Sequence, residues 1–408
     1  MSVKRQRLAR ARRAAGYTQE SLATQLGVDP TTVSKWENGR FEPQPHKRPK
    51  LAKLLRVSPN RLEELLTSSS PTLPVTERSQ SSKESTIVPS KTTAFARLDD
   101  RYVESIRSRI QELVRMDMQF GGDYSSNIAL NLFRSSVRKL GKAEMSPTIE
   151  SDLYSAIGEL GELTGWLLFD TQKHDLVRKV NNEALHLLRM AGDRSNEILT
   201  LQNMSMHAGF LNRATEAKHL ADMVLETNRL SPRLRALFLT RKARALALGG
   251  DDSSAIRTFE MATSLHLEGV RDNDPGWTWW ITNEELAWHR AMIYSDSGNW
   301  HTAVDLFEES VAGMAPHAVR GRYIHLASLL EAQVQARNWA NLPSTIDSII
   351  PYVDEVGSKR AASMLHKATS AITHVCFVPN SVQESVAQLN HTLIEAGYSP
   401  HLDYATND

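Results

Sequence analysis

Apolar residues recur with a helical period through most of this chain. From about Phe95 nearly to the end, apolar positions lie three and four residues apart, which keeps one face of a helix apolar. In the same region no stretch alternates polar and apolar residues as a half-buried strand does, and no glycine turn joins two such stretches. The pattern predicts an all-α protein.

A longer repeat lies within this helical pattern. A small or apolar residue starts the second helix of each predicted pair, with apolar residues four and seven positions later, as at Ala255, Phe259 and Ala262. The six start positions, spaced 40, 38, 48, 39 and 40 residues apart, are Val177, Ala217, Ala255, Ala303, Leu342 and Val382. Because one helical pair cannot bury its apolar face alone, such repeats stack into a solenoid with a concave groove.

Near the N-terminus the pattern changes to two short helices joined by a tight turn, in the stretch TQESLATQLGVDPTTVSKWENGR. Thr18 is placed to cap the first helix, and Gly27 to end it in a left-handed conformation. Asp29 and Pro30 are a typical cap and first residue for the second helix. The apolar positions, which face each other across the turn, are Leu22, Ala23, Leu26, Val33 and Trp36.

This stretch resembles the lambda-repressor-like (Xre-type) helix-turn-helix. The matching features are the TQ at the start of the first helix, the LA…LGV core, the TTVSKWENG second helix and the Arg40 after it. The resemblance implies a five-helix head that binds double-stranded DNA with its second helix in the major groove. It also implies an ion pair between Arg12 and Glu37. The alternative is an ordinary helical hairpin whose polar face is merely solvated.

The resemblance assigns the DNA contacts by position in the second helix. Lys35 could donate to guanine O6 and N7, Thr31 could contact a base edge or a thymine methyl, and Pro30 can make only apolar contact. The residues expected nearest the base edges are Pro30, Thr31, Ser34 and Lys35. The residues expected to contact phosphates are Gln19, Thr32, Asn38 and Arg40.

The composition between the head and the repeats indicates a tether. Residues 67–95 are rich in Ser, Thr and Pro and poor in apolar residues, so they cannot bury enough surface to order themselves. We therefore expect a helix-turn-helix domain over 1–66, a disordered linker over 67–95, a helical cap or degenerate repeat over 96–147, and a repeat domain over 148–400. A fourth helix of the head is predicted from Lys50 to Arg56, and a fifth from Ser58 to about Leu66.

The repeat region resembles a tetratricopeptide-type array of helical hairpins. An Xre-type head fused to such a body is similar to regulators of actinobacteria and to the peptide-pheromone receptors of Gram-positive bacteria. The resemblance implies a cytoplasmic, homodimeric transcriptional regulator whose groove binds a peptide, a small molecule or a protein. The alternative is a protein-interaction scaffold that the head tethers to DNA.

An insertion of tryptophans accounts for the longest of the repeat spacings. Asp274 to Trp280 reads DPGWTWW, and its three indole rings are Trp277, Trp279 and Trp280. They could line an effector pocket in the groove, or fill gaps between long helices. We favour packing.

The charge distribution agrees with a nucleic-acid-binding head. Of 48 Lys+Arg and 47 Asp+Glu, residues 1–66 hold 14 and 6, which leaves 34 and 41 for the remainder. A basic N-terminal domain joined to an acidic body is a charge distribution typical of DNA-binding proteins. No apolar run is long enough to cross a membrane, and the basic N-terminus leads into no apolar segment of a signal peptide.

No motif for catalysis or for a cofactor is present. The sequence lacks HExxH, any Cys/His cluster, phosphate-binding glycine loops and GxSxG. Its single cysteine, Cys376, lies in the apolar setting HVCFV and is predicted to be a small buried residue. We therefore expect no enzyme, no metal and no cofactor.

Overall fold

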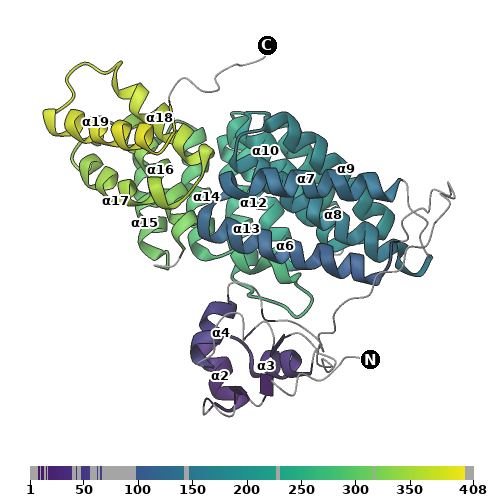
Figure 1. Ribbon diagram of the computed structural model, residues 1–408. Coiled ribbons are helices and arrows are strands. Elements are labelled where there is room, and N and C mark those ends of the chain that lie inside the picture. Colours follow the sequence, from purple (N-terminus) through teal and green to yellow (C-terminus); the bar gives the residue numbers. More distant parts are fainter. Residues whose placement is uncertain are drawn as a thin grey trace, which may run out of the picture. The chain divides into compact units, whose positions relative to one another are not determined.

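The computed structural model describes the chain as two compact units, residues 1–94 and residues 95–408. The described residues are 8–9, 11–12, 15, 17–38, 43, 47–55, 62, 65–66, 98–141, 147–226, 230–315 and 318–399. Within them every regular element is a helix, which confirms the predicted all-α class (Figure 1). The predicted linker and most of the predicted fifth helix of the head lie outside these residues.

The first unit is built on three helices that are described in full. They are α2 (Gln19–Leu26), α3 (Pro30–Glu37) and α4 (Arg48–Leu54). Helix α4 begins two residues before the predicted start at Lys50, because Pro49 sits in its first turn, where a missing N–H costs nothing. The guanidinium of Arg48 also donates to the carbonyl of Pro43 at 2.8 Å and so ties this start to the preceding loop.

The second unit is a succession of helical hairpins, drawn from blue to yellow in Figure 1. Its first four hairpins are α6–α7 (Asp100–Phe120, Gly122–Leu140), α8–α9 (Pro147–Asp170, His174–Ala191), α10–α11 (Arg194–Phe210, Ala214–Leu225) and α12–α13 (Pro232–Leu248, Asp252–His266). The short helix η2 (Gly276–Trp280) separates these from α14–α15 (Asn283–Asp296, Trp300–Gly313), α16–α17 (Val319–Gln335, Leu342–Glu355) and α18–α19 (Lys359–Ile372, Asn380–Glu395).

The repeat predicted from the sequence matches these hairpins. All six predicted start positions lie in the first turns of second helices, from α9 to α19, and all are buried. Ala303 and Phe307 are fully buried in α15, and a phenylalanine side chain contributes about 1.5–3 kcal/mol when it leaves water. The body is thus helical-repeat-like. Residues 98–141 form a hairpin of the same kind, α6–α7, which packs against α8.

The first helices of successive hairpins pack against one another over most of the body. Helix α8 contacts α10, α10 contacts α12, and α12 contacts α14, while α16 contacts α18. Helix α18 in turn contacts α8, so the last hairpin returns to the second one. Among the described residues, no helix is both long and apolar enough to cross a membrane.

The prediction for Cys376 is wrong, because this cysteine is exposed. Helix α18 ends at Ile372 and α19 begins only at Asn380, so the apolar sequence HVCFV forms a turn rather than a helix face. Its neighbour Phe377 is 98% exposed and has a φ of 65°, in the left-handed region that bulky residues rarely adopt.

Candidate nucleic-acid interface

Three local signals fix the turn between α2 and α3. The Thr18 hydroxyl accepts the N–H of Ser21 at 3.0 Å, and the Ser21 hydroxyl accepts the N–H of Thr18 at 2.9 Å, which closes a capping box. Gly27 ends α2 with φ 63° and ψ 46°. Asp29 accepts the N–H of Thr31 at 2.8 Å and begins α3. These contacts confirm the three predicted cap positions.

Packing then sets the rotation of α3. Val33 and Trp36 are 2% and 3% exposed and join one apolar cluster with Leu22, Ala23 and Leu26 of α2. With this side of α3 held in the core, Thr31 is left exposed on the other side. A helix held in this way presents a short polar face, which is what entry into a major groove requires.

A buried ion pair fastens the end of α3 to the N-terminal segment. Arg12 donates to both carboxylate oxygens of Glu37, at 2.6 and 3.2 Å, and also to the carbonyl of Tyr17 at 2.7 Å. The amide of Gln19 donates to Glu37 at 2.6 Å from the start of α2. The pair implied by the family resemblance is therefore confirmed, and Gln19 extends it to both helices.

Two of the predicted base-reading side chains already have local partners. The Thr31 hydroxyl donates to Asp29 at 2.6 Å, and this bond lowers the pKa of the Asp29 carboxyl. The Ser34 hydroxyl accepts from the amide of Asn38 at 3.3 Å. Thr31 therefore presents its methyl group and an acceptor rather than a spare donor, which suits contact with a thymine methyl.

The remaining predicted contacts lie at the surface of α3 or beyond the described residues. Thr32 and Lys35 are half-buried on α3. Pro30 is the first residue of α3, but its side chain is outside the description, as is all of Arg40. The DNA-contacting role of each predicted residue stays a prediction.

Sequence reasoning missed a contribution from Lys47. Its ammonium donates to the carbonyl of Leu26 at 2.8 Å, at the C-terminal end of α2, where a positive charge is favourable. Burial lowers the pKa of this lysine. The residue falls in a proline-rich basic loop, and the sequence there indicates only general affinity for phosphate.

In the body, two of the three inserted tryptophans pack against hairpins. Trp277 donates its indole N–H to the Ser195 hydroxyl of α10 at 3.1 Å, and with Trp280 it lies against the buried cluster between α12 and α14. Arg233 of α12 supports the insertion by donating to the carbonyl of Thr278 at 3.2 Å. Trp279 is 40% exposed. These contacts favour the packing alternative, and no effector contact is established for any of the three.

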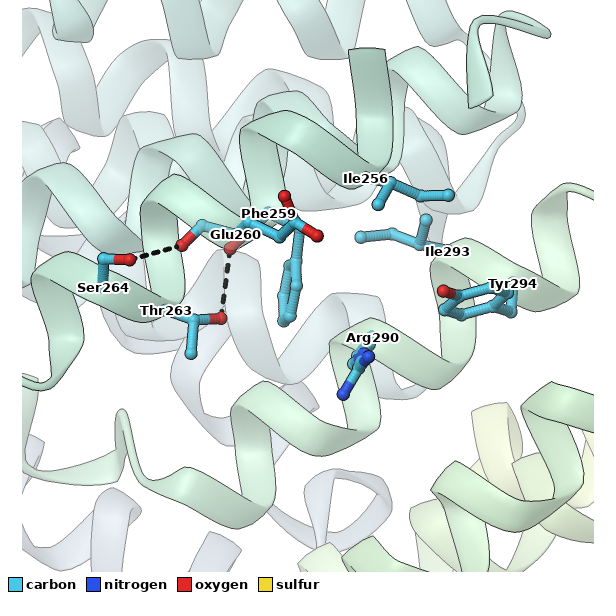
Figure 2. Close-up of a pocket in the computed structure, with 8 residues that line it drawn as sticks. All are labelled: Ile256, Phe259, Glu260, Thr263, Ser264, Arg290, Ile293 and Tyr294. Carbon is cyan, nitrogen blue, oxygen red and sulfur yellow. Dashed lines mark hydrogen bonds between the residues drawn. The ribbon is translucent and has the colours of Figure 1, made fainter. Parts of the chain in front are cut away.

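A groove of about 280 Å³ lies between α13 and α14 (Figure 2). Phe259 and Ile293 form its buried floor, and Glu260 and Arg290 bring opposite charges to it. Its residues, none of them tryptophan, are Ile256, Phe259, Glu260, Thr263, Ser264, Arg290, Ile293 and Tyr294. Helix α13 contacts α14 less extensively than α11 contacts α12, which leaves this junction partly open.

Comparison with protein families matches residues 8–62 to the helix-turn-helix family. The chain thus carries a helix-turn-helix domain, followed by a helical-repeat-like body. A domain of this class indicates a DNA-binding regulator. No curated protein matches the chain significantly.

Proposed function

We propose that the protein is a sequence-specific transcriptional regulator of the Xre type. Helix α3 enters the major groove of an operator, with Thr31, Ser34 and Lys35 nearest the bases and with Pro30 making apolar contact. Gln19, Thr32, Asn38 and Arg40 hold phosphates and set the register of the head on the duplex. The protein acts in the cytoplasm, and its role needs no catalysis.

The observation that carries this proposal is the fixed rotation of α3. Val33 and Trp36 lie in the core, and Glu37 is tied to Arg12 and Gln19, so the polar side of the helix is held outward before DNA arrives. A reading helix that is ordered in advance loses less conformational entropy on binding. The match of residues 8–62 to helix-turn-helix domains supports the same conclusion.

We propose further that the body is a tetratricopeptide-type array that dimerises and receives an effector. The six regularly spaced start positions in the second helices support this assignment. Two heads would read a two-fold operator with half-sites about one helical turn, roughly 34 Å, apart. An effector would change DNA affinity only through its different affinity for the bound and free arrangements of the dimer.

Genome-wide binding of the wild type beside a Thr31→Ala, Lys35→Ala double variant tests the DNA-binding proposal. We expect sharp peaks over a shared two-fold motif for the wild type and their loss in the variant. On the purified operator, the lost base contacts should weaken binding by about 1–3 kcal/mol, roughly 5- to 150-fold.

Lys50→Ala is the matched control, because it removes one exposed positive charge from α4 rather than from α3. Its binding should weaken to the same small extent on operator and on unrelated DNA. If the double variant also weakens both DNAs equally, the head binds without reading sequence and the proposal is wrong.

A protein-interaction scaffold is the second candidate, and exposed apolar side chains favour it. Met261 of α13 is 58% exposed, and Leu267 and Val270, which follow this helix, are 76% and 71% exposed. Large exposed apolar side chains are candidates for contact with a partner protein, most of all where they lie next to one another. Diffuse, salt-sensitive DNA binding together with one stoichiometric protein partner would favour the scaffold.

A further inference from the structure

The two ends of the body are joined through their backbones. Gly121 follows α6 and Gly357 follows α17, more than two hundred residues later. The N–H of Gly357 donates to the carbonyl of Phe120 at 2.8 Å, and the N–H of Asp123 donates to the carbonyl of Gly357 at 3.1 Å. A Cβ on Gly121 would collide with the Gly357 carbonyl, so this approach requires glycine.

A buried carboxylate lies beside this crossing. Asp170, at the end of α8, is 0% exposed. Two arginines from the far end of the chain reach its Oδ1 atom, Arg320 of α16 at 3.1 Å and Arg360 of α18 at 3.3 Å. The Ser358 hydroxyl donates to the same oxygen at 3.0 Å, and the N–H of Gly122 donates to Oδ2 at 3.2 Å.

Further contacts join the same two ends. Arg320 also lies 3.5 Å from Asp117 of α6, and its guanidinium is stacked 4.9 Å from the ring centre of Trp166 of α8. The Tyr398 hydroxyl donates to Asp123 at 3.1 Å. We name the set of Asp117, Asp170, Arg320 and Arg360 the clasp.

The clasp is held by charge rather than by a continuous apolar core. Among the described residues, the apolar cluster of α6–α9 and the cluster of α14–α19 share no member. Asp117 Oδ1, Arg320 Nε and Nη2, and Arg360 Nε are buried without a hydrogen bond of good geometry. Buried charges give little net stability, because separating them restores their hydration. The clasp is therefore a closure that can open without exposing a continuous apolar core.

Inside the array a chain of hydrogen-bonded polar side chains crosses the first helices. Arg241 of α12 donates to Gln202 of α10 at 2.9 and 3.1 Å, and to His289 of α14 at 2.6 Å. Glu285 of α14 lies 3.2 Å from His289 and 3.7 Å from His325 of α16. Arg241, His289 and His325 are 4%, 1% and 4% exposed.

Helix α16 connects the clasp with this polar chain, because it carries Arg320 of the clasp and His325 of the chain. It contacts α18, which carries Arg360 and returns to α8, whereas Glu285 and His289 lie on α14. Release of Arg320 and Arg360 from Asp170 would therefore let α16 and α18 move together and separate His325 from Glu285.

We propose that the clasp opens as a unit while the individual hairpins stay folded, and that the open array presents Arg241, Glu285, His289 and His325 to a polar ligand. The closed array is then the state that excludes the ligand. This proposal deepens the effector-binding part of the proposed function and is independent of DNA binding by the head.

The test is acylation of histidines by diethyl pyrocarbonate in the full-length protein without DNA, read by mass spectrometry. Asp170→Asn leaves Arg320 and Arg360 without their shared carboxylate. We expect His289 and His325 to react faster by on the order of 100-fold, the change in open population that follows the loss of one partner of a buried pair. His391, which is already exposed, should react as in the wild type.

Two further variants separate opening of the clasp from general damage. Glu216→Gln breaks an ion pair of 3.0 Å with Arg178, between α9 and α11, and should leave His289 and His325 protected. Asp170→Asn combined with Arg360→Met replaces charge by an uncharged contact and should restore much of the protection, because buried pairs can be replaced by apolar groups at little cost.

Two outcomes would overturn the proposal. One is unchanged reactivity of His289 and His325 in Asp170→Asn. The other is an equal rise at His207, which is 4% exposed and packed between α9 and α10, because that result would mean unfolding of the whole body. Neither readout involves DNA binding by the head. If the DNA-binding proposal were wrong, this test of the clasp would still be valid.

Discussion

Replacement of Arg12 by Met should destabilise the head more than any substitution on its surface. The change keeps most of the side-chain volume and removes the charge. Arg12 and Glu37 have side chains 8% exposed, so the variant leaves a buried carboxylate with only the Gln19 amide as partner. Losing one partner of a buried pair costs about 3–5 kcal/mol. A domain of this size has a total stability of roughly 3–10 kcal/mol.

Hydrogen exchange of the full-length protein, read by mass spectrometry, measures this loss locally. Amides of α2 and α3 should exchange on the order of 100-fold faster or more, since about 1.4 kcal/mol corresponds to a tenfold change. Helices α8 and α9 serve as the internal reference, because the substitution lies in the other compact unit. Glu20→Gln, at an exposed carboxylate in the first turn of α2, should change exchange by about twofold at most.

A second substitution shows whether the effect comes from the unpaired charge. Arg12→Met with Glu37→Leu replaces the pair by apolar groups and should recover much of the lost protection. A change of less than about tenfold in Arg12→Met alone would refute the reasoning, because it would mean that water reaches the Glu37 carboxylate.

Two predictions concern buried groups of the body, each measured by urea unfolding against the wild type. Burial, and to a lesser extent the charge of the neighbouring Glu159, raises the pKa of Glu162 to about 8. The folded state therefore favours the protonated carboxyl, and its stability falls as the pH rises from about 4.5 to 8. Glu162→Gln should therefore gain stability over the wild type between pH 5 and pH 8, by as much as roughly 3 kcal/mol, and an unchanged difference would contradict this. Tyr323→Phe removes a buried hydroxyl that has no hydrogen-bond partner among the described residues, and should raise the free energy of unfolding by about 1 kcal/mol. A loss of stability in that variant would mean that the hydroxyl is hydrated or bonded.

The head could be predicted in detail because its signals are local. The caps at Thr18 and Asp29 and the stop at Gly27 act on residues within one turn of themselves, so their positions in the sequence determine the geometry. The second helices of the hairpins could be predicted for a similar reason. A small residue such as Ala255 must face the first helix of its own hairpin, and helical spacing shows that face.

The closure of the body could not be predicted in this way. Asp170 and its partner Arg360 are 190 positions apart, and no local pattern in the sequence links the two. Each hairpin is rotated slightly relative to the one before it, and these rotations add up along the array. The total decides which helices meet, and it cannot be read from the sequence of any one repeat. The prediction that Cys376 is buried failed for a different reason. Its neighbours in the sequence are apolar, which indicated burial, but the chain makes an exposed turn there.

The crossing of Gly121 and Gly357 has a consequence for how this body can evolve. An open solenoid lengthens by duplication of a repeat, since each unit contacts only its neighbours. Here an added or deleted hairpin between α6 and α17 would displace Gly357 by about one interhelical distance, roughly 8–10 Å, and break both backbone bonds at the crossing. The number of hairpins is thus fixed by closure, so inherited variation should be confined to substitutions and to loops such as the tryptophan insertion.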